Sequence, residues 1–302
     1  MSPNPATVTS LPLARLPSIA EGAAPSRPAP DKPVALEDMR LSGSRRVRRQ
    51  VPQPLLRLAA PLGFLAIWQI VAALGLVDSR SLTSPLAVIE AAAALWSVGD
   101  LQRHLLASLY RVVWGLALGI GSGLTLAILA GLFRWGEHVV DSSMNIVRMV
   151  PVIALLPLII VWMGIGEPAK IALIVLGVTF PVYMNSFAAI RGVDQKLVEA
   201  GQAFGLSRWG LVRRVILPGA VPGFLVGLRW ALGAAWLLLF FAEQINADRG
   251  IGYLINQAQA WNRTDIIILG LVIYGIFGFA GDQLVRLIER FALSWRKGFQ
   301  GA

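Results

Sequence analysis

Long apolar stretches, separated by short polar segments, dominate the chain from about residue 55 onward. Each reaches about 20 residues, which is the length an α-helix needs to cross a hydrocarbon core roughly 30 Å thick. The pattern predicts an all-α integral membrane protein with about six transmembrane helices. The predicted spans are residues 55–76, 108–132, 146–165, 169–190, 220–243 and 265–288.

Two features of the spans bear on how they pack. Gly115, Gly119 and Gly123 are four residues apart in the second span, so they share one helix face and let another helix approach closely. Prolines in the spans predict kinked helices that line a moving pathway, although kinked packing without function is the alternative. These prolines are Pro151 and Pro157 in the third span, Pro181 in the fourth and Pro222 in the first turn of the fifth.

The polar segments predict the domain organisation. Residues 1–50 are rich in Pro, Ala, Ser and Arg, have no sustained hydrophobic period and are predicted to be a disordered basic tail. Residues 51–302 form the predicted transmembrane domain. In the 77–107 segment, the sequence SPLAVIEAAAALW predicts a short helix at the membrane surface.

The distribution of basic residues predicts the orientation. The arginines of the tail directly precede the first span, and the 191–218 loop carries five basic residues, whereas residues 164–170 contain only Lys170. Positive charge concentrates in cytoplasmic loops. We therefore expect a multi-pass membrane protein with both termini in the cytoplasm and with lipid contacts at the basic cluster.

Composition excludes several classes of function. Hydrophobic residues make up 56% of the chain and charged residues only 15%, which argues against a soluble enzyme. The net charge of +10 fits basic cytoplasmic loops and does not indicate nucleic-acid binding. The chain has no cysteine, and His104 and His138 fall in different predicted loops, so no metal site is expected. No phosphate-binding GxxxxGK[ST] loop, GxSxG or HExxH motif occurs, so we expect neither catalytic residues nor a cofactor in this chain.

A polar segment, about residues 194–218, interrupts the apolar pattern before the fifth span. It predicts two short helices with a turn at Gly205, with Ser207 capping the second helix and Glu199 in the first turn of the first. The segment has more apolar surface than a plain loop needs. Docking into a cleft of another protein and lying on the lipid surface are both consistent with this pattern. The apolar residues are Phe204, Leu206, Trp209, Leu211 and Val212.

This segment resembles the cytoplasmic signature EAA-x3-G-x9-I-x-LP of binding-protein-dependent ABC importer permeases. Glu199, Ala200 and Gly201 match its first three positions, and Gly205 follows at the required spacing. Nine residues after Gly205 come the matches to its final positions, with valine in place of isoleucine and with glycine in place of alanine at position 201. These final positions are Val215, Leu217 and Pro218; Leu206 follows the signature glycine. The resemblance implies a type I importer fold in which this segment is the coupling helix.

Further stretches resemble the permeases for aliphatic sulfonates. The resemblance implies a homodimer in the cell inner membrane that works with two cytoplasmic ATPase subunits and an extracytoplasmic binding protein, with ATP and magnesium bound by the ATPase. Taurine, nitrate or bicarbonate is the alternative cargo, and an ion-coupled secondary transporter is a second, different alternative. The stretches are LTSPLAVIEA (82–91), VPVIALLPLIIVWMGIGEPAKI (150–171), AEQINADRGIGYLI (242–255) and RTDIIILGLVIYGIFG (263–278).

Polar residues in the spans are candidates for the translocation pathway. Arg229 lies well inside the fifth predicted span, where an arginine costs about 2.5–3.5 kcal/mol and so faces protein or water. It attracts a passing anion or, alternatively, pairs with a carboxylate or a helix C-terminus. Asn185 lies in the fourth span. Glu243, Gln244 and Asn246 are expected to form an outer gate or a contact to the binding protein or, alternatively, a solvated helix end.

Overall fold

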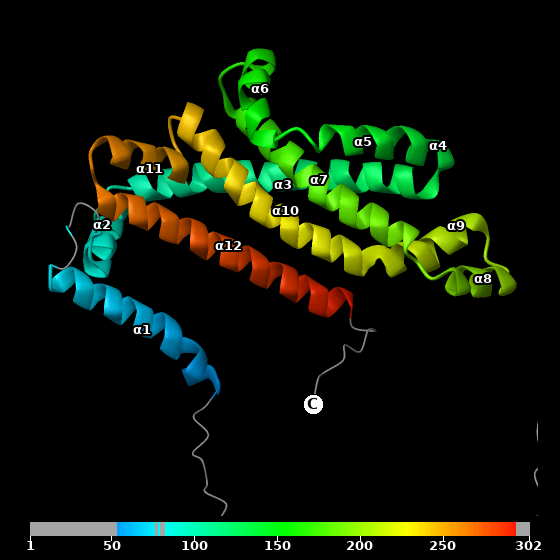
Figure 1. Ribbon diagram of the computed structural model, residues 1–302, viewed down its shortest axis with the longest axis horizontal. Coiled ribbons are helices and arrows are strands. Elements are labelled where there is room, and N and C mark those ends of the chain that lie inside the picture. The colour runs from blue at the N-terminus through cyan, green and yellow to red at the C-terminus, as the bar shows by residue number, and fades with distance from the viewer. Residues whose placement is uncertain (1–52, 76–77, 79–81, 294–302) are drawn as a thin grey trace, which may run out of the picture. The chain divides into compact units, whose positions relative to one another are not determined.

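The computed structural model describes residues 53–75, 78 and 82–293, and it is helical with no β-strand in these ranges. The predicted tail of residues 1–50 lies outside them. The helices up to residue 147 are α1 (Gln53–Ala73), α2 (Pro85–Ser97), α3 (Asp100–Leu132), α4 (Arg134–Gly136), η2 (Glu137–Asp141) and α5 (Ser142–Val147). The helices from residue 152 onward are η3 (Val152–Leu155), α6 (Leu156–Met163), α7 (Glu167–Arg191), α8 (Gln195–Ala203), α9 (Arg208–Leu211), η4 (Val212–Ile216), α10 (Leu217–Asn246), α11 (Ile251–Ala260) and α12 (Thr264–Ala292) (Figure 1).

Within the described residues, four helical segments are long and apolar enough to cross a membrane. These are Asp100–Leu132, Glu167–Arg191, Arg208–Ile245 and Thr264–Ala292. They confirm the second, fourth, fifth and sixth predicted spans. The first predicted span coincides with α1, which has 21 residues.

The third predicted span, 146–165, is not one continuous helix. Arg134–Val147 and Val152–Met163 meet at 87°, so together they are a broken span or a re-entrant loop. The break lies just before Pro151, which has no N–H to donate and disfavours helical backbone at Val150. Pro157 falls in the first turn of α6, where proline is tolerated, and α7 continues unbroken through Pro181.

The segment between the first two spans is shorter than predicted. The expected surface helix is present as α2, with Pro85 in its first turn and with the Ser84 side chain accepting a hydrogen bond from Ala87 N at 3.2 Å. However, α3 begins at Asp100 rather than at residue 108. His104 therefore lies on a helix and not in a loop, and His138 lies in the π-helical turn η2.

Close packing of α3 on α7 uses the predicted glycine face. A Cβ atom on Gly119 would lie 2.6 Å from Val178 Cβ, and one on Gly123 would lie 2.8 Å from Thr179 O. The two helices run parallel, because the broken span between them returns the chain to its starting side. The partner of this small-residue face is thus α7 of the same chain.

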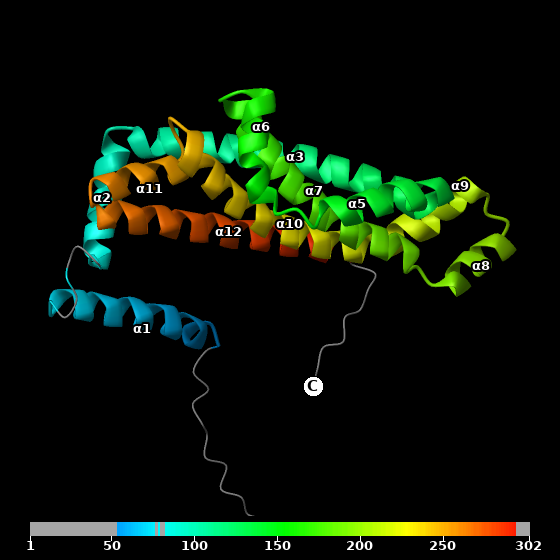
Figure 2. The ribbon, with the colours of Figure 1, turned by 45° about the horizontal axis from the view of Figure 1, so that its top comes forward.

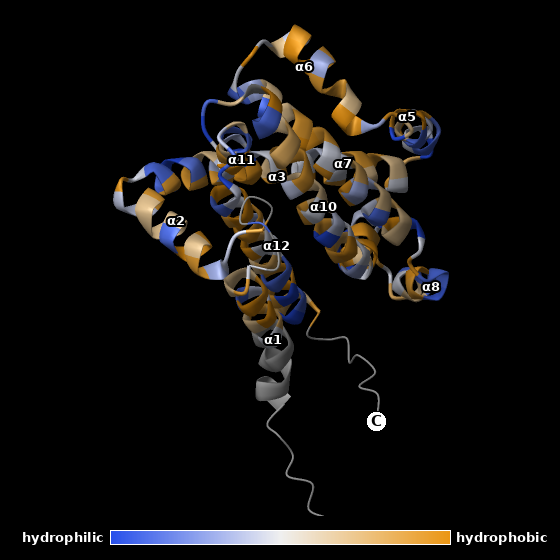
Figure 3. Ribbon diagram, turned by 60° about the vertical axis from the view of Figure 1, so that its left-hand side comes forward, coloured by the Kyte–Doolittle hydropathy of each residue, from blue (hydrophilic) through white to orange (hydrophobic). Residues whose placement is uncertain are grey.

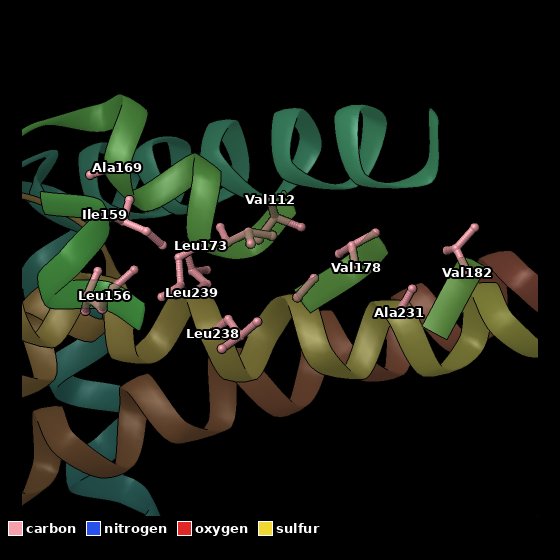
Figure 4. Packing of buried hydrophobic residues seen from close by; sticks show 13 residues of the cluster. Val112, Leu156, Ile159, Ala169, Leu173, Val178, Val182, Ala231, Leu238 and Leu239 are labelled. Carbon is pink, nitrogen blue, oxygen red and sulfur yellow. The ribbon is translucent and has the colours of Figure 1, made fainter. Parts of the chain in front are cut away.

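The main hydrophobic core lies around α7, which packs between α3 and α10 (Figure 4). α10 runs antiparallel to α7, and α12 packs along α10, with the rings of Trp236 and Phe277 stacked at 5.2 Å. Hydrophobic residues predominate along these long helices (Figure 3). The core residues are Val112, Leu156, Ile159, Ala169, Leu173, Ile174, Val178, Val182, Ala231, Ala235, Leu238, Leu239 and Ala242.

The long helices place two short helical elements at opposite ends. α8 and α9 connect α7 to α10 at one end, and α11 connects α10 to α12 at the other (Figures 1 and 2). The predicted spans 220–243 and 265–288 leave residues 244–264 between them as a loop. α11 forms there because Ile251, Leu254, Ile255 and Ala258 recur at helical spacing and are all buried.

Candidate functional site

A buried arginine joins four segments at the α11 end of the molecule. The Arg111 side chain on α3 is 0% exposed. Its Nε and Nη2 donate to the two carboxylate oxygens of Glu167, each at 2.6 Å, at the start of α7. Its Nη1 donates to Glu243 Oε1 on α10 and to Arg249 O before α11, each at 2.7 Å. Arg111 therefore fixes the relative positions of α3, α7, α10 and the α11 connection.

Glu243 is the buried acidic partner in this cluster. Its side chain is 0% exposed and accepts hydrogen bonds from Ser108 Oγ at 2.7 Å and from Gly252 N at 2.8 Å. Tyr274 OH donates to Glu243 Oε2 at 3.3 Å. The alternative of a solvated helix end is therefore wrong for Glu243, because the helix end is covered by α11 and by its preceding loop.

The cluster also fixes the N-terminus of α11. His104 Nδ1 accepts a hydrogen bond from Gly250 N, and Ser108 Oγ accepts one from Ile251 N, each at 2.9 Å. Gly250 has φ +129°, and a side chain there would strike the Glu243 carboxylate. His104 is thus a structural acceptor. No group of three or more potential metal ligands occurs in the part of the chain that the structure describes.

The other predicted gate residues lie beside this cluster. Asn256 Nδ2 donates to Gln244 Oε1 at 2.8 Å, which links α10 to α11. The Asn246 side chain lies outside the described residues. A role for Gln244 and Asn246 in a gate stays a prediction.

A pocket of about 1140 Å³ opens next to Arg111. α3, the α6–α7 connection and the α10–α11 connection form its walls. The pKa of Asp248 in this wall lies below its usual value, chiefly because its own backbone N–H donates a hydrogen bond to the carboxylate, with Arg249 adding to the effect. The lining residues are Arg103, Leu106, Ala107, Tyr110, Arg111, Ile165, Gly166, Glu167, Lys170, Ile245, Ala247, Asp248 and Arg249.

At the opposite end, the 194–218 segment folds as the predicted helix pair. α8 ends where Leu206 N donates to Gly201 O at 3.0 Å and Gly205 N donates to Gln202 O at 2.9 Å. This Schellman motif requires a left-handed residue, and Gly205 supplies it with φ +78°. Ser207 caps the second helix by accepting from Gly210 N at 3.2 Å.

Glu199 is exposed but is not in the first turn of α8. The helix begins at Gln195, after Asp194 accepts from Lys196 N at 2.9 Å, so Glu199 lies in the second turn. There it accepts a hydrogen bond from Gln195 Nε2 at 2.9 Å. Its position is explained by the helix start at Asp194, which is a better N-cap than the residues that follow it.

The two short helices touch at Gly201, the glycine that replaces the second alanine of the family signature. Gly201 is buried, and a Cβ atom there would lie 2.7 Å from Leu211 Cδ2 and 3.5 Å from Val215 Cγ2. The substitution therefore lets α8 approach the following helix more closely than alanine allows. Leu211 is buried by this contact, whereas three large apolar side chains of the pair remain exposed. These are Leu197 at 57%, Phe204 at 87% and Trp209 at 69%.

The remaining signature residues lead into α10. Val215 lies in the π-helical turn η4, and Leu217 and Pro218 follow it at the start of α10, within the continuous helical segment Arg208–Ile245. Ala200 is exposed and Leu206 is partly buried. The structure thus brings the signature residues together in one continuous helix–turn–helix unit.

Arg229 pairs with carboxylates of α12. Its Nε lies 3.2 Å from Asp282 Oδ1 and its Nη2 lies 3.0 Å from Glu289 Oε2. This arrangement is the one expected if Arg229 pairs with a carboxylate rather than attracting a passing anion. Asn185 Nδ2 donates to Pro181 O at 2.8 Å in its own helix, at the contact with α10. Neither residue lines the pocket at the α11 end.

Replacing Arg229 tests which interpretation holds. We expect Arg229→Gln to lower the thermal midpoint of the chain, because it leaves Glu289 without its partner, and we expect adding Glu289→Gln to restore much of the loss. The expected loss in the free energy of unfolding is about 1 kcal/mol or less, because the ion pair is half-exposed. Transport per assembled complex is measured beside stability. A double variant that is stable but does not transport would instead place the Arg229 charge in the pathway.

Sequence reasoning missed Arg111, although a usable signal was present. Arg111 falls inside the predicted second span, and an ionisable residue in a span needs a partner or a function. Its partners could not be identified, because Glu167 and Glu243 are 56 and 132 residues away in the chain.

Comparison with known proteins identifies a matching family and two similar transport permeases. Residues 123–293 match the family described as "Binding-protein-dependent transport system inner membrane component". The chain is 42% identical over 248 residues to the putative aliphatic sulfonates transport permease protein SsuC of Escherichia coli (strain K12), which covers 81% of this chain and 94% of that relative. It is 34% identical over 260 residues to the taurine transport system permease protein TauC of the same strain, covering 83% and 94%.

Among solved structures, the fold is similar to the crystal structure of an amino acid ABC transporter with histidines. The TM-score is 0.54 at 18% identity, and the match covers 66% of this chain and 96% of that chain. At this level of identity the likeness concerns the fold alone.

Proposed function

We propose that this chain, which belongs to the family of inner-membrane components of binding-protein-dependent transport systems, forms the translocation pathway for aliphatic sulfonates. As a member of this family it is the permease subunit of an ABC importer and not an enzyme. The observation that carries the choice of cargo is the higher identity to the sulfonate permease, 42%, than to the taurine permease, 34%. Taurine, nitrate or bicarbonate is the alternative cargo.

The working assembly comprises two copies of this chain, two ATPase subunits that bind ATP and magnesium, and an extracytoplasmic binding protein. The α8–α9 pair supports the ATPase contact, because Phe204 and Trp209 expose apolar surface on the helix pair that carries the signature residue Glu199. The ATPase dimer closes on ATP binding and moves this pair, and α10 continues from it without a break. ATP binding and the loaded binding protein favour the outward-open state, since each binds that state better.

The α8–α9 end faces the cytoplasm in this proposal, and the α11 end faces outside. α7 and α10 are both long enough to cross the membrane, so their two ends lie on opposite faces. α9 and the following turn η4 carry Arg208, Arg213 and Arg214, which fits a cytoplasmic position. Both termini are then cytoplasmic.

Uptake in a reconstituted system tests the proposal. The chain is reconstituted with its ATPase and binding protein, and ATP-dependent uptake of labelled ethanesulfonate is compared with uptake of taurine. We expect ethanesulfonate to be taken up with the higher kcat/KM, and none without ATP. Preference for taurine would overturn the choice of cargo. Reporter fusions after residue 302 and near Arg249 should read inside and outside respectively, and the reverse result would overturn the orientation.

A further inference from the structure

The pocket at the α11 end has the composition of an anion site. Of its lining residues, Arg103, Arg111, Lys170 and Arg249 are basic, and only Glu167 and Asp248 are acidic. Basic groups that converge on one concave surface concentrate anions there. The buried Arg111 cluster alone does not explain why the pocket lining carries more positive than negative charge.

The internal ion pairs neutralise the inner wall and leave the rim positive. Glu167 is occupied by Arg111 and by Lys170, whose Nζ lies 3.2 Å from Glu167 Oε1. Asp248 meets Arg249 only at 3.5 Å, and the Arg249 side chain is 63% exposed. The Arg103 side chain is exposed and has no hydrogen bond or ion pair to any residue that the structure describes. Arg103 and Arg249 thus present free donors at the pocket.

The buried cluster holds these two cations in place through the backbone. Arg111 donates to Arg249 O at 2.7 Å, and His104, next to Arg103 on α3, accepts from Gly250 N at 2.9 Å. The segment that carries Arg249 is thereby tied to the helix that carries Arg103. The arginine backbones are fixed while their side chains stay exposed, which suits a pre-formed site.

Apolar side chains line the same pocket. Leu106 is 67% exposed, Tyr110 54%, Ile165 79% and Ile245 61%. A pocket with cations beside exposed apolar walls matches a ligand with an anionic head and a short hydrocarbon chain. A sulfonate group offers three acceptor oxygens and stays charged at every physiological pH.

We propose that this pocket is an entry subsite for alkanesulfonates, with the sulfonate held by Arg103 and Arg249 and the alkyl chain against Leu106 and Tyr110. The choice of sulfonate rests on the proposed function. An anionic phospholipid shares the chemistry of a charged oxygen-rich head on a hydrocarbon chain, and the experiment below distinguishes this source. The volume of about 1140 Å³ exceeds that of the ligand, so water remains and binding is weak, as a passage site requires.

Binding to the purified full-length chain tests the subsite. The chain is placed in phosphatidylcholine nanodiscs, and binding of hexanesulfonate is followed by ligand-observed NMR, with empty nanodiscs subtracted. Hexanol, which has the chain but no charge, serves as the comparison ligand. The variant is Arg103→Gln/Arg249→Gln. The matched control is Arg134→Gln, because Arg134 is also exposed and without an ion pair in the described part of the chain, but lies at the other end of α3.

We expect hexanesulfonate to bind wild type and Arg134→Gln equally, to bind the double variant about tenfold more weakly, and to bind more tightly than hexanol. Equal binding by the double variant and the control would overturn the subsite. So would hexanesulfonate binding no better than hexanol, or binding that disappears in phosphatidylglycerol nanodiscs, because the pocket would then take lipid.

Uptake by the reconstituted complex separates this inference from the proposed function. The subsite predicts that Arg103→Gln/Arg249→Gln raises the KM for hexanesulfonate uptake, whereas the control Arg134→Gln leaves this KM at the wild-type value. An unchanged KM overturns the subsite while wild-type uptake still supports sulfonate transport. No sulfonate uptake by the wild-type complex, with binding to the chain intact and lost in the double variant, would refute the cargo and retain the pocket.

Discussion

Replacing Arg111 with methionine should destabilise the chain by about 3–5 kcal/mol, because it leaves the Glu243 carboxylate buried without its cation. Glu243 is 0% exposed, so water cannot replace the lost partner. The same change removes both hydrogen bonds to Glu167 and the one to Arg249 O, so the start of α7 and the α11 connection each lose a link to α3. Thermal unfolding of the purified chain in nanodiscs measures the loss.

Two further variants show whether the unpaired charge is the cause. Arg111→Met/Glu243→Gln should recover a large part of the loss, because the neutral amide keeps the shape of Glu243 and needs no counter-charge. Arg103→Met removes an exposed arginine from the same helix and should change stability by no more than about 0.5 kcal/mol. If Arg111→Met unfolds at the same temperature as Arg103→Met, the cluster does not stabilise the fold.

The sequence was sufficient to predict the elements whose signals are local. The spans follow from apolar length, the start of α2 from Ser84 and Pro85, and the α8–α9 turn from Gly205 and Ser207. A span signal lies within one continuous stretch of chain, and the other two signals depend on residues within one or two turns of one another. The glycine face of α3 could also be predicted, because Gly119 and Gly123 are one turn apart, although the pattern did not identify α7 as its partner.

Features that depend on distant residues could not be predicted. The 87° break follows from Pro151, but proline elsewhere in this chain, at Pro181, leaves the helix continuous, so proline alone does not fix the outcome. The burial of Glu243 depends on Arg111, Ser108 and α11, which the sequence separates widely. The apolar residues of α11, beginning at Ile251, do recur at helical spacing, but α11 has only 10 residues and is therefore too short to stand out as a span.

Replacing Glu199 with lysine should reduce ATP-driven uptake by about tenfold or more, while the complex still assembles. Glu199 is exposed, and its hydrogen bond from Gln195 Nε2 lies within α8, so the chain should remain folded. In the proposed function it contacts the ATPase, where reversing an interface charge costs several kcal/mol of binding. Uptake and ATP hydrolysis in the reconstituted complex are measured together. We expect stimulation of hydrolysis by the loaded binding protein to fall with uptake.

Gln202→Lys is the matched control, because Gln202 is exposed on the same helix, three residues from Glu199, and receives the same lysine side chain. If α8 lies on lipid instead of in an ATPase groove, both lysines strengthen attraction to anionic head groups, and both variants should transport like wild type. If α8 docks by the signature carboxylate, only Glu199→Lys should lose uptake. Wild-type uptake by Glu199→Lys at equal complex levels would therefore reject the coupling assignment and favour the lipid interpretation. The exposed side chains of Phe204 and Trp209 on the α8–α9 pair would then be membrane anchors rather than contacts to the ATPase.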